Sequence, residues 1–249
     1  MQHEKKVGII LAAGRGSRLK ELSLEQPKPM IEVNNITIIS NLVKHLIAAQ
    51  MDQIVVIIGY KADKLKKHLQ PFSDQVELLF VENPIFDTTN NIYSLWLAKE
   101  HLRDGFFLFE ADVFLEEAIL FDFLKSDKED VMLVDKFTAN MNGTVVDFDD
   151  HKKVLGMYLR VNQTGDFSFD NKFKTVNFYK ISKRLSESFF IDKLDYHIEH
   201  KDTGSYYELI IKEAIESGWD FYAHETGTLK WYEIDTQEDL VFAQKLFEH

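Results

Sequence analysis

An apolar run that ends in a basic, glycine-containing loop lies near the start of this chain. Residues 10–19 read ILAAGRGSRL, and Lys28 follows between two prolines. The apolar run predicts a buried strand over Val7–Ala12, and Gly14 and Gly16 let the loop after it approach a ligand closely. Proline flanks favour an extended, stiff backbone around the lysine. The segment therefore predicts a strand followed by a phosphate-binding loop. A tight strand-to-helix turn with exposed arginines is the alternative.

Strand and helix patterns alternate through the first half of the chain. Apolar runs predict strands at residues 53–59, 75–81 and 105–109, and helical spacing predicts helices at 38–50, 61–69 and 92–102. This alternation is typical of a mainly parallel sheet with helices on both faces. Ligands bind such sheets outside the carboxyl ends of the strands. We therefore expect the Gly14 loop, Asn83 and Asp112 on one edge, because each follows a predicted strand.

The second half mixes strands and helices without a regular alternation. Strands are predicted at 131–134, 143–148, 153–160, 174–180, 219–224 and 230–234, and helices at 185–199, 206–217 and 236–247. The expected fold is α/β, a Rossmann-like three-layer sandwich with a mixed, mainly parallel central sheet and an α+β second half. We expect one domain over 1–249. Its parts are a nucleotide-binding part (1–130), an acceptor-binding part (131–229), and a metal-ligand strand with a closing helix (230–249).

Composition narrows the classes of protein that fit. The formal net charge is −12, which argues against nucleic-acid binding. Residues 1–35 nevertheless carry a balance of +2, which favours a small anionic ligand at one site. The absence of cysteine excludes thiolate catalysis, and no apolar run is long enough to predict a membrane partner. We expect a cytoplasmic location, since no apolar signal segment opens the chain.

Two pairs of carboxylates share one spacing. Glu110 and Asp112 follow an apolar strand, and Glu233 and Asp235 follow another, so each pair points to one face. Hard oxygen ligands at strand ends suit Mg²⁺. A solvated strand end is the alternative for Asp112, and a helix N-terminal charge for Asp235. The acidic residues 147–150 are predicted to form a hairpin turn, because they lie between two strands.

The opening motif, with its proline-flanked Lys28, resembles the nucleotidyltransferase superfamily that activates sugar phosphates and related compounds. Within it, residues 90–95 (NNIYSL) and 231–235 (WYEID) resemble the bacterial choline-phosphate and 2-aminoethylphosphonate cytidylyltransferases. The resemblance is strong over 7–115 and 230–248. It is weak over 135–205, where acceptor specificity is expected.

The resemblance implies the nucleotidyltransferase fold, Mg²⁺ on Asp112 and Asp235, and CTP as a substrate. We expect Lys28 and Arg18 to be catalytic, since they would hold the triphosphate and stabilise developing charge. The residues expected to bind the nucleotide are Leu11, Ala12, Ala13, Gly14, Gly16, Lys28, Asn83, Asn90, Ser94 and Ala111. Lys136 and Glu233 are expected to bind the acceptor. The alternatives are an ordinary turn for Asn83, a helix cap for Asn90 and a surface lysine for Lys136.

The predicted reaction transfers CMP from CTP to 2-aminoethylphosphonate or phosphocholine and releases pyrophosphate. A group of aromatic residues forms either a wall for a quaternary ammonium or part of the core: Tyr206, Tyr207, Trp219, Trp231 and Tyr232. We favour the aminoethylphosphonate, since no compact aromatic cage is evident.

A sugar-1-phosphate nucleotidyltransferase using UTP or dTTP is the alternative enzyme, and an inactive nucleotide-binding sensor is the alternative from another class. Because the chain ends inside a predicted helix, fusion to, or partnership with, another enzyme of the same pathway is a further expectation.

Overall fold

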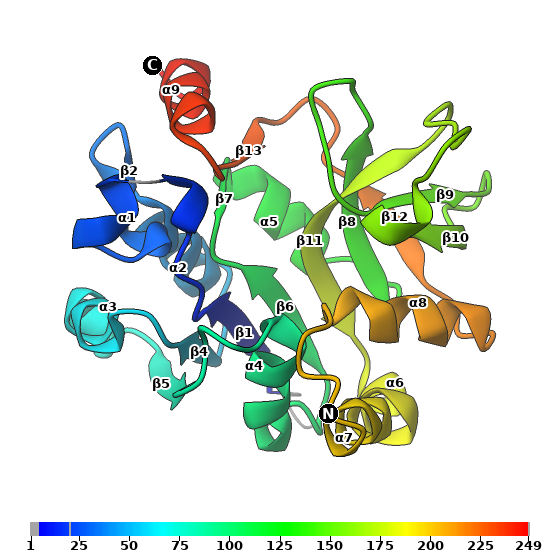
Figure 1. The fold of residues 1–249 in the computed structure, drawn as a ribbon, viewed down its shortest axis with the longest axis horizontal. Helices are drawn as coiled ribbons and strands as arrows, with labels where there is room; N and C mark the ends of the chain where they lie inside the picture. Colours follow the sequence, from blue (N-terminus) through cyan, green and yellow to red (C-terminus); the bar gives the residue numbers. More distant parts are fainter. Residues whose placement is uncertain (1–4, 20, 249) are drawn as a thin grey trace.

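A mixed sheet forms the centre of the molecule in the computed structural model, which describes residues 5–19 and 21–248 (Figure 1). Seven of its strands follow the order β10-β9-β11-β6-β1-β4-β5, and β8 and β12 extend from β11. The strands are β1 (Val7–Ala12), β4 (Gln53–Ile58), β5 (Glu77–Glu82), β6 (Phe106–Glu110), β8 (Val131–Lys136), β9 (Val145–Phe148), β10 (Val154–Tyr158), β11 (Phe173–Ile181) and β12 (Tyr222–Glu225).

The first-half strands pair in parallel, as the alternating pattern predicts. β1 lies between β4 and β6, with Leu11 opposite both Ile57 and Glu110. The carboxyl ends of β1 and β6 therefore lie together at one edge. β11 then runs antiparallel to β6, β8 and β9, which makes the sheet mixed. The predicted fold class is confirmed.

Helices cover both faces of the sheet, because β1 alternates its apolar side chains between them. Ile9 and Leu11 pack into one core, and Ile10 and Ala12 into the other. The first core is covered by α4 (Asn91–Leu97), α7 (Ile191–Glu199) and α8 (Glu208–Glu216). The second is covered by α2 (Ile38–Ala48), α3 (Ala62–Leu69) and α5 (Glu117–Leu124). The helices α1 (Glu21–Glu25) and α6 (Lys183–Leu185) are short.

A second, small sheet joins the end of the chain to its middle. β7 (Val113–Leu115) follows β6 and pairs antiparallel with β13 (Trp231–Glu233), and α9 (Gln237–Leu246) comes next. A third apolar cluster, which includes Leu19, Phe114 and Ile234, lies between this unit and the hairpin β2 (Glu32–Val33) and β3 (Ile36–Thr37). The sequence patterns did not predict β7, α5 or this hairpin.

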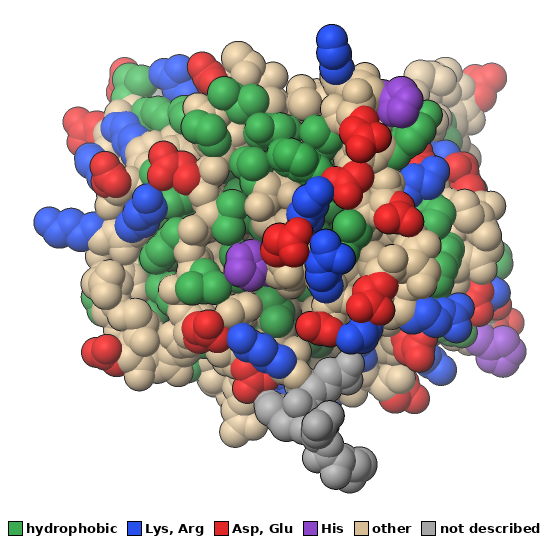
Figure 2. Space-filling model, turned by 90° about the horizontal axis from the view of Figure 1, so that it is seen from below, with side chains coloured by type: hydrophobic (Ala, Val, Ile, Leu, Met, Phe, Trp, Pro, Cys, Tyr) green, Lys and Arg blue, Asp and Glu red, His purple; other side chains and the backbone are tan. Residues whose placement is uncertain are grey.

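Within the described part of the chain, no helix combines the length and apolar character needed to cross a bilayer. On the face shown in Figure 2, basic side chains are interspersed with acidic ones around apolar patches.

Candidate active site

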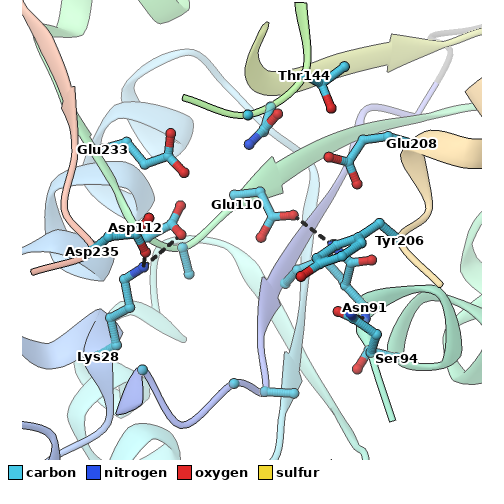
Figure 3. Close-up of a pocket in the computed structure, with 18 of the residues that line it drawn as sticks. Lys28, Asn91, Ser94, Glu110, Asp112, Thr144, Tyr206, Glu208, Glu233 and Asp235 are labelled. Carbon is cyan, nitrogen blue, oxygen red and sulfur yellow. Dashed lines mark hydrogen bonds and ion pairs between the residues drawn. The ribbon is translucent and has the colours of Figure 1, made fainter. Parts of the chain in front are cut away.

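A cleft of about 1020 Å³ opens at the carboxyl ends of β1 and β6 (Figure 3). Most residues expected to bind the nucleotide line it: Leu11, Ala12, Ala13, Gly14, Gly16, Lys28, Asn90, Ser94 and Ala111. Arg18 and the acidic residues Glu110, Asp112, Glu233 and Asp235 line it as well. The topology therefore gathers residues from both ends of the chain at the edge where parallel sheets bind ligands.

The loop after β1 is shaped to pack against Lys28. Gly16 has a φ of +66°, and a Cβ there would lie 2.6 Å from the Cβ of Lys28. Any larger residue would push the lysine away. A Cβ on Gly14, in contrast, would meet no atom within 4 Å. Gly14 therefore leaves space that a ligand can fill.

The segment around Lys28 differs from the predicted extended backbone. Pro27 is extended, but Lys28, Pro29 and Met30 form a 3₁₀ turn, closed by a hydrogen bond from Ile31 N to Lys28 O of 3.0 Å. The expectation of an extended lysine was wrong, because a proline in the first turn of a helix costs no hydrogen bond. The turn still fixes the lysine.

Lys28 lies between two carboxylates from distant parts of the chain. Its Nζ is 2.8 Å from Asp112 Oδ2 and 2.7 Å from Asp235 Oδ1, and Arg18 reaches the same Asp235 oxygen at 2.9 Å. Burial acts to lower the pKa of Lys28, but the attraction of the two aspartates outweighs it, so the net pKa is raised. Lys28 is therefore a fixed positive charge in the cleft.

Three carboxylates lie close enough to hold a divalent cation. Oxygen atoms of Asp112, Glu233 and Asp235 lie within 4.8 Å of one another. The buried Oδ1 of Asp112 has no hydrogen-bond partner, so it is available as a ligand. A set of carboxylate oxygens suits Mg²⁺. Glu233, which was expected to bind the acceptor, lies with the two aspartates.

Backbone pairing holds these carboxylates together. Glu233 lies opposite Val113 in the β7–β13 ladder, and Ile234 N donates to Asp112 O at 2.9 Å. Thr236 caps α9 and forms a capping box with Asp239, whose Oδ2 also accepts a hydrogen bond from Asp235 N. The start of α9 therefore positions Asp235.

At the other side of the cleft lie Glu110, Asn91 and Glu208 (Figure 3). Asn91 Nδ2 donates to Glu110 Oε1 at 3.1 Å, and Tyr207 N donates to Asn91 Oδ1 at 2.9 Å. Loss of hydration, together with neighbouring carboxylates, raises the pKa of Glu110, and loss of hydration also raises that of Glu208. The sequence analysis missed Glu208. The signal that could have identified it is its spacing: Glu208 lies on the same helix face as the apolar residues Ile211 and Ile215, where a charged residue is unusual.

Lys136, which was expected to bind the acceptor, does not line the cleft among the described residues, whereas Lys174 does. Lys136 is exposed at the end of β8. Lys174 is 2% exposed, and its Nζ lies 3.2 Å from Glu233 Oε2. The two lysines lie on neighbouring strands, and only the strand pairing decides which side chain faces the cleft.

Asn83 also lies off the cleft. It is 1% exposed, and its Nδ2 donates to Thr89 Oγ1 and Ser94 Oγ while its Oδ1 accepts from Ile85 N. Its hydrogen bonds shape the loop below the cleft, as the turn alternative predicted. Asn90 caps α4 and also donates from Nδ2 to Gly204 O at 3.2 Å.

The aromatic residues do not form a common wall. Tyr206 lines the cleft, whereas Tyr207 and Trp231 are buried. Trp219 packs on Phe189, and Tyr232 on Phe242. Of residues 147–150, which were predicted to form a hairpin turn, Asp149 and Asp150 lie in the β9–β10 turn, whereas Asp147 and Phe148 end β9. Asp147 pairs with Lys172.

Comparisons with known proteins show which proteins this chain is similar to. The chain is 27% identical over 93% of its length to a CMP-5'-(3-aminopropyl)phosphonate synthase of Streptomyces rubellomurinus, and spans 37% of that protein. It is 31% identical over 61% of its length to a 2-aminoethylphosphonate cytidylyltransferase of Lancefieldella rimae, and spans 60% of it. The fold matches a solved CTP:phosphocholine cytidylyltransferase from Streptococcus pneumoniae with a TM-score of 0.83, at 22% identity, over 99% of this chain and all of that one.

The sequence model of the nucleotidyl transferase family matches residues 7–158. That segment covers more than half of the chain and holds the loop after β1, Lys28 and Asp112. The chain therefore belongs to the nucleotidyl transferase family.

Proposed function

We propose that this chain catalyses the Mg²⁺-dependent transfer of CMP from CTP to a small phosphonate that bears an amine, and that it releases pyrophosphate. The observation that carries the proposal is the cluster of Lys28, Asp112 and Asp235 beside the glycine loop. It combines a fixed cation, a set of metal-type carboxylates and an open backbone loop. Nucleotidyl transfer requires these three components.

The reaction needs positioning more than proton transfer. A phosphate-type second pKa is about 6, so the acceptor oxygen is largely ionised at neutral pH and requires no general base. That oxygen attacks the α-phosphorus of CTP, and the bond from this phosphorus to the bridging oxygen of pyrophosphate breaks. Lys28 and Arg18 would hold the triphosphate oxygens as negative charge shifts to the leaving group. The loop at Gly14 and Gly16 would position the nucleotide.

Asp112, Asp235 and Glu233 would hold Mg²⁺. The bound ion would supply charge neutralisation between the phosphate groups. Lys174 lies against Glu233 and is placed to attract the phosphonate, in the role expected of Lys136. The remaining nucleotide contacts would come from the ends of β1 and β6 and from Asn90 and Ser94 on α4.

The choice of CTP and of an aminophosphonate draws on the relatives. Two of them are named for aminoalkyl phosphonates and CMP transfer. The cleft supports an amine rather than a sugar, because carboxylates line the side away from Lys28. A relative named for choline phosphate, 26% identical over 93% of this chain, makes phosphocholine the second acceptor to test.

A matrix of nucleotides and acceptors tests the proposal. CTP, UTP and dTTP are each combined with 2-aminoethylphosphonate, phosphocholine and glucose 1-phosphate, with Mg²⁺, and pyrophosphate release is measured. We expect release with CTP and the aminophosphonate. Preferred use of UTP or dTTP with glucose 1-phosphate would show a sugar-phosphate enzyme. No release in any combination would indicate a nucleotide sensor.

A further inference from the structure

We infer that Glu208 selects a primary ammonium group on the acceptor by accepting hydrogen bonds from its N–H donors. The inference rests on the proposed function and assigns a residue to the acceptor's cationic end. It concerns the side of the cleft that lies across Glu110 from the Asp112–Asp235 pair (Figure 3).

Glu208 has an unused acceptor inside the cleft. The residue is 9% exposed and lines the cleft, and its Oε2 is buried without a hydrogen-bond partner. A buried carboxylate oxygen without a partner costs free energy, because it has lost water and gained no donor. A ligand that brings N–H donors removes this cost. Glu208 Oε2 is therefore an acceptor that a donor on a ligand can satisfy.

Three of the cations that line the cleft are paired with carboxylates other than Glu208, and Arg160 also lines it. Lys28 and Arg18 pair with aspartates, and Lys174 pairs with Glu233 at 3.2 Å. Glu110 accepts from Asn91, a neutral amide. Within residues 5–19 and 21–248, no ion pair involves Glu208. A ligand that carries a positive charge therefore has Glu208 as its free partner.

The surroundings favour a primary ammonium over a quaternary one. A trimethylammonium has no N–H, and sites that bind it do so with the faces of several aromatic rings. The aromatic residues among the described lining are Phe86 and Tyr206. The polar side chains on this side of the cleft include the carboxylate of Glu110 and the amide of Asn91. These groups accept hydrogen bonds, which only an N–H cation can donate.

Kinetics on an acceptor series test the assignment. The acceptors are 2-aminoethylphosphonate and its N,N,N-trimethyl analogue, which are both cationic at the nitrogen at neutral pH, and ethylphosphonate, which has no such nitrogen. Each is assayed with wild type, with Glu208→Gln, and with Glu216→Gln as the matched control. Glu216 lies on the same helix, but it is exposed and pairs with Lys212.

We expect wild type to prefer the primary amine over its trimethyl analogue by at least about 10-fold in kcat/KM. Glu208→Gln should lower kcat/KM for the primary amine by about 10- to 100-fold and change that for ethylphosphonate by less than about 3-fold. Glu216→Gln should behave as wild type. An equal loss for all three acceptors would overturn the inference, because it would show a structural role.

Wild-type selectivity keeps the test decisive if the glutamine variant does not fold. Equal or better use of the trimethyl analogue by wild type contradicts the inference by itself. The proposed function fails separately, when wild type releases no pyrophosphate from CTP with any acceptor of the series.

Discussion

At the scale of single residues, Asp112 connects the cation and the carboxylates of the cleft. Its Oδ2 accepts from Lys28 at 2.8 Å, while its buried Oδ1 has no partner. One oxygen therefore balances the lysine, and the other is free for a metal ion. A neutral side chain of the same shape removes both functions and leaves the packing intact.

Asp112→Asn is expected to lower turnover at saturating Mg²⁺ by far more than about 10-fold, which corresponds to about 1.4 kcal/mol in the barrier. Steady-state pyrophosphate release measures it. Asp149→Asn, in the β9–β10 turn, is the control and should leave turnover unchanged. A loss of less than 10-fold in Asp112→Asn would remove this residue from the metal site.

Asp130 links stability to pH away from the cleft. Burial raises its pKa from 3.8 to about 6, although hydrogen bonds from Ser182 oppose the shift. Between these values the unfolded chain has released the proton and the folded protein still holds it, so stability falls as pH rises. A shift of about two units corresponds to about 3 kcal/mol.

Asp130→Asn should therefore flatten the fall of the unfolding free energy between about pH 4 and pH 6. Urea unfolding across this range measures the slope. Asp127→Asn, an exposed neighbour, should keep the wild-type slope. Parallel curves for wild type and Asp130→Asn would show that Asp130 is ionised in the folded protein throughout.

At the scale of elements, the start of α9 positions Asp235, a candidate metal ligand. The Thr236 hydroxyl accepts from Asp239 N, and Asp239 Oδ2 accepts from the backbone N–H groups of Asp235 and Thr236. The helix cap at Thr236 and the candidate metal ligand Asp235 therefore belong to the same turn. Loss of the cap should affect both stability and the site.

Thr236→Ala is expected to lower the unfolding free energy by about 1 kcal/mol and to raise the Mg²⁺ concentration needed for half-maximal turnover. Denaturant unfolding and a Mg²⁺ titration measure the two effects. Thr236→Ser retains the hydroxyl and should stay close to wild type. A stability loss with an unchanged Mg²⁺ requirement would show that the cap does not position Asp235.

The loop after β1 offers a second test, because Gly16 packs against Lys28 and Gly14 has open space around it. Gly16→Ala places a side chain at positive φ and against Lys28, so it should lower the unfolding free energy by at least about 1 kcal/mol. Gly14→Ala should leave stability unchanged, since its Cβ meets nothing, and should weaken nucleotide binding. Thermal unfolding with and without CTP separates the two. Equal destabilisation by both variants would contradict this difference.

At the scale of the whole molecule, the site is an interface between the two ends of the chain. Lys28 and Asp235 are 207 positions apart, and the β7–β13 ladder brings the last strand back to the centre. A ligand that contacts both ends should therefore stabilise the entire fold. Binding of such a ligand should therefore raise the free energy of global unfolding.

CTP with Mg²⁺, each at about 100 times its dissociation constant, is expected to raise the unfolding free energy by about 3 kcal/mol. For a domain of this size, that is a rise in Tm of about 5–10 °C. Differential scanning calorimetry measures it, and ATP with Mg²⁺ is the control for base preference. A rise with CTP that is independent of Mg²⁺ would argue against a metal between the two ends.

The fold class and the loop side of the cleft could be predicted from the sequence. Alternating apolar periods fixed β1, β4, β5 and β6, and parallel pairing then brought Gly14 and Asp112 to one edge. Local patterns carry this information because side-chain periodicity is a short-range property, and parallel sheets bind ligands at the carboxyl ends of their strands. A strand as short as β7 is too short to show an alternating apolar pattern, so the β7–β13 pairing that positions Glu233 was not predicted.

By itself, then, the sequence determined a mainly parallel sheet with a glycine-containing loop after its first strand, and it predicted the candidate metal ligands. Only the tertiary structure decided which side chains face the cleft. It placed Lys174 there instead of Lys136, directed Asn83 into a loop, and exposed Glu208 to the cleft with an unpaired oxygen. The physical reason is that strand register and helix packing depend on contacts between distant segments, and residue spacing along the chain does not encode those contacts.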